Sequence, residues 1–361
     1  MGSIKERQRQ DGSTAYLAQI IIKRKGRPTH REAATFNRRS AATAWIKNRE
    51  AELREPGGVD RAKVKGKTLG DAIARYVDED AKGIGRTKTQ VLAAVKRHSI
   101  AQKECASISS ADIVGFAREL AEGVRPSTVG NYLSHIQSVF AIARPAWGYE
   151  LDPQIMADAF TVCRRLGYTG PADSRTRRPT LEELDKLMTF FAERDERWPN
   201  AAPMTVIIAF AIFSTRRESE IIRIHRKDFE PQHKRALVHD MKHPGQKKGN
   251  DVWVGLTDEA VAIMEAMTTT DIIFPYTTDA IGAAFTRACK VLAIEDLRFH
   301  DLRHEGVSRL FEMGWDIPRV ALVSAHRSWA SLQRYSHIRQ SGDKFKDWKW
   351  LPRVIERARR G

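Results

Sequence analysis

Apolar and polar residues alternate along the first part of the chain with the two-residue period of β-strands. Three stretches show this pattern: residues 4–10, 14–25 and 30–36. Asp11-Gly12-Ser13 has the composition of a tight turn after the first stretch, and Gly26-Arg27-Pro28 interrupts the pattern before the third. Ser40 then predicts the N-cap of a helix that ends near Arg54. We therefore expect a three-stranded sheet and one helix in residues 1–58.

Beyond the run Glu55–Gly58, which predicts a linker, the apolar residues take the three- and four-residue spacing of amphipathic helices. The helical stretches of this middle region are 69–77, 87–96, 111–120 and 127–143. Ser109 and Asp112 have the spacing of a capping box, and Pro126 stands at the start of a helix, where proline is tolerated. We therefore expect an all-helical domain over residues 66–166.

The last part of the chain, residues 176–361, predicts helices around one short hairpin. It follows a second linker at Gly170–Arg175, which Arg177 and Arg178 extend as a basic strap, and Thr180 caps its first helix. Further helices are predicted up to about residue 224 and over 258–267, 279–292, 301–313, 318–323 and a stretch around 335. The predicted strands are 235–240 and 251–256. The expected fold class is mainly α with small β elements (α+β).

The net charge points to a polyanionic partner. The chain carries 61 Lys and Arg residues against 45 Asp and Glu, a formal net charge of +16, and residues 1–65 hold 16 of the basic residues against 7 acidic ones. Nucleic acid or an anionic membrane surface would both suit this charge. The longest apolar run, residues 204–213, is too short to cross a bilayer. The sequence therefore favours nucleic acid over a membrane.

The three cysteines, Cys105, Cys163 and Cys289, are too far apart in sequence to predict a disulfide framework or a metal site. They fit buried thiols in a reducing compartment, and the polar start of the chain lacks the apolar core of a signal peptide. We therefore expect a cytoplasmic protein.

Five residues carry the chemical groups needed to attack a phosphodiester without a metal. They are Arg217, His300, Arg303, His326 and Tyr335. Two guanidiniums can bind the non-bridging oxygens, a phenol can act as the nucleophile, and an imidazole can take its proton. Glu220, three residues after Arg217, can hold that arginine from behind.

A competing interpretation concerns His300 and His304, which have the spacing of the zinc-binding H-E-x-x-H motif with Asp301 in place of the glutamate. Aspartate is a shorter base, and the net charge suits DNA better than a peptide substrate. The metal-free interpretation is therefore favoured.

Basic residues outside this set are candidate contacts to phosphates, because phosphate contacts dominate the affinity of proteins for DNA. The candidates are Lys23 and Lys25 in the first domain, Lys96, Arg97 and Arg125 in the helical domain, and Lys247 and Lys248 at the hairpin tip.

Arg217-x-x-Glu220, His300-x-x-Arg303, His326 and Tyr335 together resemble the signature of the tyrosine recombinase (phage integrase) family. The order matches, and so do the spacings of 23 residues from Arg303 to His326 and 9 from His326 to Tyr335. The resemblance is strong over residues 175–361. It implies an arm-type DNA-binding domain over 1–58, a core-site-binding domain over 66–166 and a catalytic domain over 176–361.

The resemblance implies a site-specific recombinase that cleaves and rejoins double-stranded DNA through a 3′-phosphotyrosine intermediate, with no cofactor and no metal. Tyr335 would attack the scissile phosphate, and Arg217 and Arg303 would stabilise the transition state. His300 would accept the tyrosine proton, and His326 would bind a phosphate oxygen.

A lysine of the hairpin would protonate the leaving 5′ oxygen in such an enzyme. Lys242 fits best because it stands at the end of a predicted strand, and Lys247 and Lys248 are the alternatives. Thr215 and Ala325 stand where the family usually has glycine, which predicts altered loops or a less active site.

The resemblance also implies a homo-tetramer on DNA, with accessory directionality or bending proteins and without a membrane. The family's tail after the nucleophile docks on a neighbouring subunit, and the apolar residues within 336–361 either do the same or pack on their own domain. A type IB topoisomerase-like enzyme and a DNA-binding regulator without catalysis are the alternative functions.

Overall fold

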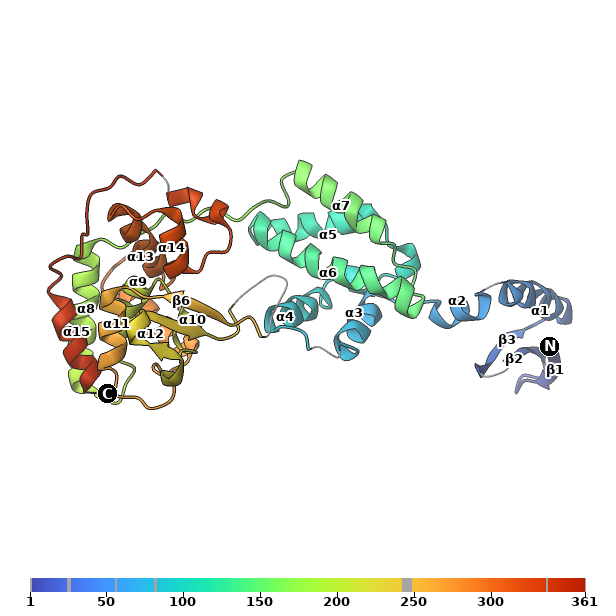
Figure 1. The fold of residues 1–361 in the computed structure, drawn as a ribbon. Helices are drawn as coiled ribbons and strands as arrows, with labels where there is room; N and C mark the ends of the chain where they lie inside the picture. Colours follow the sequence, from blue (N-terminus) through green and yellow to red (C-terminus); the bar gives the residue numbers. More distant parts are fainter. Residues whose placement is uncertain are drawn as a thin grey trace. The chain divides into compact units, whose positions relative to one another are not determined.

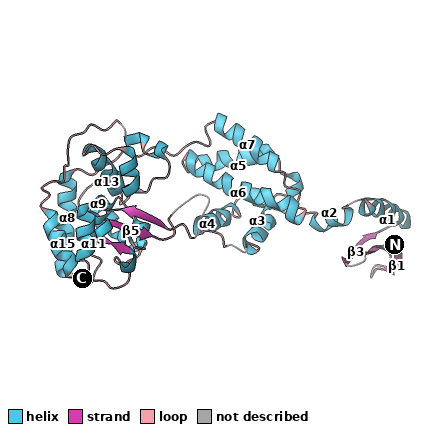
Figure 2. Ribbon diagram, in the orientation of Figure 1, coloured by secondary structure: helices cyan, strands magenta, loops and turns pink. Residues whose placement is uncertain are grey.

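The computed structural model describes residues 2–24, 27–55, 57–80, 83–241, 249–335 and 337–360. The chain divides into two compact units, an N-terminal unit of residues 1–173 and a C-terminal unit of residues 174–361. The described residues form mainly helices, with one three-stranded antiparallel sheet in each unit (Figures 1 and 2). This confirms the predicted α+β class.

The N-terminal sheet has the strand order β1-β2-β3, with β1 at Gly2–Gln8, β2 at Thr14–Arg24 and β3 at Arg27–Phe36. Helix α1 (Arg39–Arg54) packs on the sheet, and buried Ile20 and Leu53 form part of their shared core. The three strands and the helix were predicted.

Two details at the ends of α1 differ from the prediction. Ser40 is not the N-cap, because the helix already begins at Arg39 and Arg38 occupies the cap position with no side-chain hydrogen bond. The predicted linker is also shorter than expected, since helix α2 (Gly58–Val64) begins inside it. Gly57, with a φ of 77°, supplies the left-handed turn before α2.

The helical part of the N-terminal unit contains the four helices predicted from apolar spacing and one further helix, α7 (Pro153–Arg165), which was not predicted. Its helices are α3 (Leu69–Asp78), α4 (Arg86–Val95), α5 (Ser110–Ala121), α6 (Pro126–Trp147) and α7 (Pro153–Arg165), with 3-10 turns at Ser99–Gln102 and Cys105–Ser107. The predicted capping box of Ser109 and Asp112 forms, and Pro126 occupies the first turn of α6 as expected. Leu92, Leu133 and Phe140 are among the side chains that fill the core.

The C-terminal unit surrounds one apolar helix. Its helices are α8 (Leu181–Arg197), α9 (Met204–Ser214), α10 (Glu218–Ile221), α11 (Asp258–Ala266), α12 (Thr278–Val291), α13 (Asp301–Glu312), α14 (Ile317–Ser324) and α15 (Trp350–Arg359). Its strands are β4 (Phe229–Glu230), β5 (Arg235–Val238) and β6 (Val252–Gly255), and 3-10 turns lie at Arg226–Asp228, Pro231–His233, Trp329–Ser331 and Gln333–Tyr335. The structure confirms the capping of α8 by Thr180. Strand β4 was not predicted.

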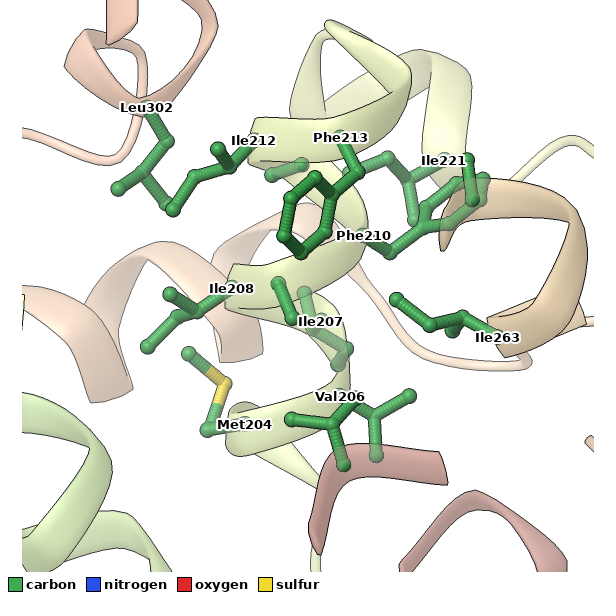
Figure 3. Close-up of a cluster of buried hydrophobic side chains, with 14 of the residues drawn as sticks. Met204, Val206, Ile207, Ile208, Phe210, Ile212, Phe213, Ile221, Ile263 and Leu302 are labelled. Carbon is green, nitrogen blue, oxygen red and sulfur yellow. The ribbon is translucent and has the colours of Figure 1, made fainter. Parts of the chain in front are cut away.

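Every residue of α9 is buried, which explains why this helix has no polar face in the sequence. Helices α8, α11, α13 and α15 all contact it, and Figure 3 shows Ile208, Phe210 and Ile212 within this core. Gly306 of α13 lies so close to α9 that a Cβ atom there would stand 2.1 Å from the carbonyl oxygen of Ile212. The ends of α9 and α13 are therefore held in a fixed relation to each other.

The apolar C-terminal tail packs on its own unit. Helix α15 contacts α9 and α11, and Phe345, Trp348 and Trp350 are buried in the same core. The indole of Trp350 donates a hydrogen bond to Asp185 at 2.7 Å. The tail was expected either to dock on a neighbouring subunit or to pack on its own domain, and in this structure it packs on its own domain. No helix among the described residues has the length and apolar character needed to cross a membrane.

Candidate active site

The loop after α9 carries the first of the predicted catalytic arginines. Thr215 ends α9 in a left-handed conformation with a φ of 57°, and Arg217 then precedes α10. Glu220, which is 2% exposed, receives a hydrogen bond from Nη1 of Arg217 at 2.5 Å and one from its backbone N–H at 3.1 Å. The carboxylate therefore fixes the guanidinium from behind, as the sequence predicted, and leaves the side chain of Arg217 partly exposed.

The second arginine, Arg303, lies buried in the first turn of α13. Its Nη1 donates to the carbonyl oxygen of Thr215 at 2.6 Å, and its Nη2 donates to that of Ser324 at 2.9 Å. Burial, with Arg216 and Arg217 close by, lowers the pKa of Arg303 to about 9, so the guanidinium remains charged at neutral pH. Arg303 thus joins the loop after α9 to the loop after α14.

Glu220 is the carboxylate at the centre of these arginines. One of its oxygens lies 3.5 Å from Nη1 of Arg216 and 3.9 Å from Nη1 of Arg303. Burial alone would raise the pKa of Glu220, but Arg216, Arg303 and Arg217 outweigh that effect and lower it. The site therefore combines three guanidiniums with one ionised carboxylate, and its cations outnumber its anion.

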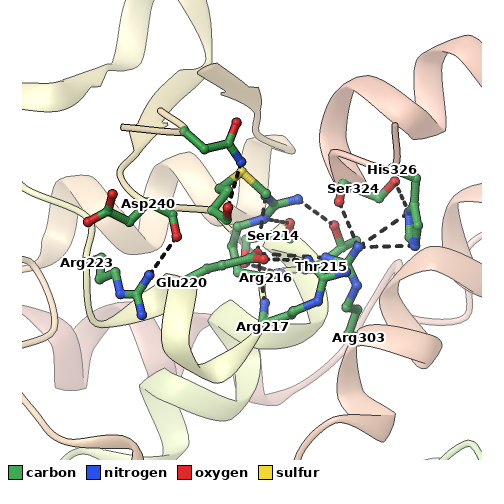
Figure 4. Close-up of polar contacts among 12 residues, drawn as sticks. Ser214, Thr215, Arg216, Arg217, Glu220, Arg223, Asp240, Arg303, Ser324 and His326 are labelled. Carbon is green, nitrogen blue, oxygen red and sulfur yellow. Dashed lines mark hydrogen bonds and ion pairs between the residues drawn. The ribbon is translucent and has the colours of Figure 1, made fainter. Parts of the chain in front are cut away.

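His326 follows the left-handed residue Ala325, whose φ is 52°, and stands beside Arg303. Its Nδ1 lies 2.7 Å from Oγ of Ser324, and its Nε2 lies 3.2 Å from Nη2 of Arg303 (Figure 4). Burial, Arg303 and Arg217 lower the pKa of His326 to about 3. The imidazole is therefore neutral at pH 7 and has one N–H group to donate.

Thr215 and Ala325 thus adopt left-handed conformations without being glycine. Such a conformation is uncommon for a β-branched residue and implies local strain. The backbone at both residues thus has the conformation that glycine favours. The expectation of altered loops or a less active site stays a prediction.

His300 precedes α13 and is exposed. Partial loss of water around its ring, together with Arg303 and Arg217, lowers its pKa. The ring is thus a neutral imidazole at pH 7, which is the state that accepts a proton.

Tyr335 is buried at 7% exposure in the 3-10 turn Gln333–Tyr335, and its ring stacks on that of Phe311. Its hydroxyl lies 2.5 Å from Nδ1 of His304, and burial raises the pKa of the phenol. Burial and the neighbouring His300 lower the pKa of His304 to about 4, so the imidazole accepts the phenol's hydrogen. The hydroxyl is therefore engaged with His304 rather than with an arginine.

Sequence reasoning considered His304 only as a zinc ligand. The sequence did offer one indication that His304 belongs to the site: it follows Arg303 directly and lies about one helical turn after His300. Asp301, which lies between His300 and His304 in the sequence, accepts hydrogen bonds from Arg175. Within the described ranges, no group of three or more His, Cys, Asp or Glu side chains is placed to hold a metal ion.

The basic strap before α8 binds acidic residues of α13. Nε and Nη2 of Arg175 each donate to Asp301 at 2.7 Å, and Nε of Arg178 donates to Glu305 at 2.9 Å. Both carboxylates are fully buried. Arg334, next to Tyr335, donates to the backbone carbonyl of Arg175 at 2.6 Å. The strap thus contacts residues next to two predicted catalytic side chains, His300 and Tyr335.

The predicted hairpin lysines Lys242, Lys247 and Lys248 lie outside the described residues, and so does Lys25. The base of the hairpin is described. The backbone N–H of Met241 donates to the carbonyl of Asn250 at 2.9 Å, and Arg327, next to His326, donates to the Asn250 side chain.

The remaining candidate DNA contacts belong to the N-terminal unit. Lys23 is exposed on β2, Lys96 and Arg97 are exposed at the end of α4, and Arg125 is exposed just before α6. Arg125 lies 3.5 Å from Asp173, which is also exposed. Their accessibility is compatible with phosphate binding, which stays a prediction.

Comparison with known proteins identifies the class to which this site belongs. Residues 177–341 match the phage integrase family. The chain is 30% identical over 266 residues to the shufflon-specific DNA recombinase of Escherichia coli, covering 68% of this chain and 62% of that protein. It is 27% identical over 157 residues to the integrase of Salmonella phage P22, covering 38% of this chain and 39% of that one.

The fold agrees with these relatives. The structure of the Tn1549 transposon integrase in complex with a circular intermediate DNA has a TM-score of 0.56 to this chain at 12% identity, and the match covers 81% of this chain and 99% of the other. Residues 177–341 therefore form a domain of the phage integrase, or tyrosine recombinase, family. The chain spans a little under two thirds of the shufflon recombinase.

Proposed function

We propose that this protein is a site-specific recombinase, which cleaves and rejoins double-stranded DNA through a 3′-phosphotyrosine intermediate. The main support is that Arg217 and Arg303 share one ionised carboxylate, Glu220, and that His326 lies beside Arg303. Such a group of fixed donors suits a phosphate whose charge grows in the transition state, because its dipoles and charges need no reorganisation.

The chemistry assigned to these residues is a transesterification. The phenol oxygen of Tyr335 attacks the scissile phosphorus, and its proton passes to the neutral imidazole of His300. The bond between phosphorus and the 5′ oxygen breaks, and Lys242 gives that oxygen a proton. Arg217 and Arg303 bind the non-bridging oxygens, and His326 donates a hydrogen bond to one of them.

The second half of the reaction restores the DNA backbone. A 5′ hydroxyl from another DNA strand attacks the phosphotyrosine and displaces Tyr335, which recovers a proton. Each step breaks one phosphate ester bond and forms another, so the exchange needs no external energy source. The 3′-phosphotyrosine keeps the phosphodiester energy between the two steps.

Tyr335 has to exchange its hydrogen bond with His304 for the phosphate before it can attack. The 3-10 turns at Trp329–Ser331 and Gln333–Tyr335 are short, and such turns have poorer hydrogen-bond geometry than an α-helix. A small rearrangement of this segment is therefore part of the proposal. DNA binding supplies the phosphate that replaces His304 as the partner of the hydroxyl.

The proposed partners follow from charge and from the family. Double-stranded DNA is the substrate, with Lys23, Lys96, Arg97 and Arg125 as contacts of the N-terminal unit and the hairpin lysines as contacts of the C-terminal unit. We propose a homo-tetramer on DNA, assisted by accessory directionality or bending proteins, that acts on nucleoid DNA in the bacterial cytoplasm. The division into arm-binding, core-binding and catalytic domains is part of this proposal.

The test is to incubate the full chain with DNA that flanks its own gene, and to separate the products on a denaturing gel. A covalent protein–DNA adduct with sequenced recombinant junctions is expected. Relaxed supercoils without recombinant junctions would instead indicate a topoisomerase. DNA binding without any adduct would indicate a regulator.

A further inference from the structure

We infer that Arg216 is a positioning residue for DNA cleavage, because its buried guanidinium ties together the two loops that carry Arg217 and His326. The inference rests on the proposed recombinase function. Arg216 is distinct from the six residues that carry out the proposed chemistry, and its side chain is 1% exposed. It acts through its neighbours rather than on the DNA.

The contacts of Arg216 bridge the loop after α9 and the loop after α14. Its Nε donates to the carbonyl oxygen of Ser214 at 3.1 Å, and its Nη2 donates to that of Val323. Nη2 also lies 3.3 Å from Oγ1 of Thr215, whose hydroxyl in turn donates to Val323 at 3.4 Å. Figure 4 shows Arg216 between Glu220 and Arg303, at the centre of these polar contacts.

These contacts hold two strained turns. Thr215 and Ala325 both have left-handed backbones, with φ values of 57° and 52°. Non-glycine residues keep such conformations only where surrounding contacts enforce them. Among the described residues, the loops are joined by hydrogen bonds of Arg216 and of the Thr215 hydroxyl to Val323. Arg303 joins them as well, through Thr215 and Ser324. Arg216 therefore stabilises the same geometry as Arg303 from deeper in the fold.

The burial of Arg216 is itself unfavourable, which argues for a specific role. A buried guanidinium loses its hydration, and an apolar residue of similar size usually packs at lower cost. Nη1 of Arg216 makes no hydrogen bond among the described residues, and its compensation is the carboxylate of Glu220 at 3.5 Å. The chain thus keeps a partly satisfied buried cation beside Glu220, the carboxylate that also pairs with Arg217 and Arg303.

The alternative is that Arg216 only stabilises the domain, and Arg309 provides the matched control. Arg309 is also 1% exposed and belongs to the same unit, but its partners are Asp343 and Glu259, which hold no proposed catalytic group. Replacement of either arginine by Met removes a buried cation of similar size. The two variants therefore differ mainly in which loops lose their contacts.

The experiment measures single-turnover cleavage of a nicked duplex at saturating DNA, together with the Kd for DNA and the Tm. Arg216→Met is expected to lower the cleavage rate by about a hundredfold, as small displacements of catalytic groups do, with the Kd little changed. Arg309→Met is expected to lower the Tm. At temperatures below that Tm, its cleavage rate is expected to equal that of the wild type. Arg216→Lys retains the charge without the two-pronged donor and is expected to remain slow.

A rescue variant separates positioning from charge. Thr215→Gly and Ala325→Gly relieve the strain of the two turns, so adding both to Arg216→Met is expected to recover part of the lost rate. A wild-type cleavage rate in Arg216→Met, or in Arg216→Lys if the Met variant does not fold, would overturn the inference. Failure of the wild-type protein to form any adduct would instead contradict the proposed function.

Discussion

The hydroxyl of Tyr335 lies 2.5 Å from Nδ1 of His304, so the proposed nucleophile has a histidine partner one residue after Arg303. This hydrogen bond has to break before the phenol reaches a phosphate. His304→Phe keeps the ring but removes the acceptor. Because one hydrogen bond is worth about 1 kcal/mol, we expect single-turnover cleavage to become about fivefold faster at saturating DNA.

Stability measurements provide the control for this variant. If the hydroxyl bonds to His304, then His304→Phe and Tyr335→Phe should each lower the free energy of unfolding, and the double variant should cost less than their sum. Slower cleavage by His304→Phe would show that His304 takes part in the reaction instead of restraining the nucleophile.

Tyr335→Phe should abolish the covalent adduct while leaving DNA affinity within about threefold, because the change removes only the attacking oxygen. Adduct formation is read on a denaturing gel, and affinity by a mobility shift. Tyr276→Phe is the matched control, since Tyr276 is a partly buried tyrosine packed against the core of the same unit. A persistent adduct in Tyr335→Phe would assign the nucleophile to another residue.

The two arginines should differ in what their loss does to the fold. Arg217→Ala should slow cleavage by about 100- to 1,000-fold, the usual effect of losing one transition-state donor, with little change in Tm because its side chain is partly exposed. Arg303→Ala should slow cleavage and also lower the Tm, because it frees the carbonyls of Thr215 and Ser324. Equal Tm values for the two variants would contradict this division.

The stability of the C-terminal unit should decrease as the pH falls below about 6.5. Folding lowers the pKa of His304 to about 4 and of His326 to about 3, so the unfolded chain binds more protons in this range. Their stabilisation is fully present above the unfolded pKa and is lost as the pH falls towards the folded values. The check is the urea midpoint at pH 7 and pH 5.

A variant isolates the histidine contribution to this pH dependence. Burial raises the pKa of Asp195 to about 6. This carboxyl therefore favours the folded state as the pH falls, which opposes the effect of the histidines to the same extent in the wild type and in the variant. His304→Phe should therefore show a smaller loss of stability between pH 7 and pH 5 than the wild type does. An unchanged pH dependence would mean that His304 is not kept neutral by folding.

Arg175→Ala should cost about 3 kcal/mol of unfolding free energy, because it leaves the fully buried Asp301 without its cation. Arg298→Ala is the control, since Arg298 is exposed and lies 4.0 Å from the exposed Asp296. Its loss should be within about 0.5 kcal/mol. Chemical denaturation distinguishes the two, and equal costs would mean that the strap contributes little to the unit.

Sequence patterns predicted the elements whose signals are local. The capping box at Ser109, the cap at Thr180 and the helical form of the apolar run 204–213 depend on neighbouring residues in the chain, and they form as expected. The cap at Ser40 was wrong because the helix starts before it, and a side chain within the first turn does not serve as the cap.

The parts of the site that the sequence did not predict depend on contacts between distant segments. His304 meets Tyr335 across 31 residues, and Arg175 meets Asp301 across 126. The burial of Arg216 is likewise invisible in the sequence, where two adjacent arginines indicate a solvated surface. The motif residues were found because their order and spacing are specific, whereas these supporting residues have no such spacing.

Gly306 fixes how closely α13 approaches α9. Even one methyl group there would collide with the backbone of Ile212 and push the start of α13 outward, moving His300, Arg303 and His304 together. The distance between Arg303 and the turns that it holds is therefore set by the absence of a side chain at Gly306, about one helical turn after Arg303. Sequence changes that respect every proposed catalytic residue could still inactivate this protein at that position.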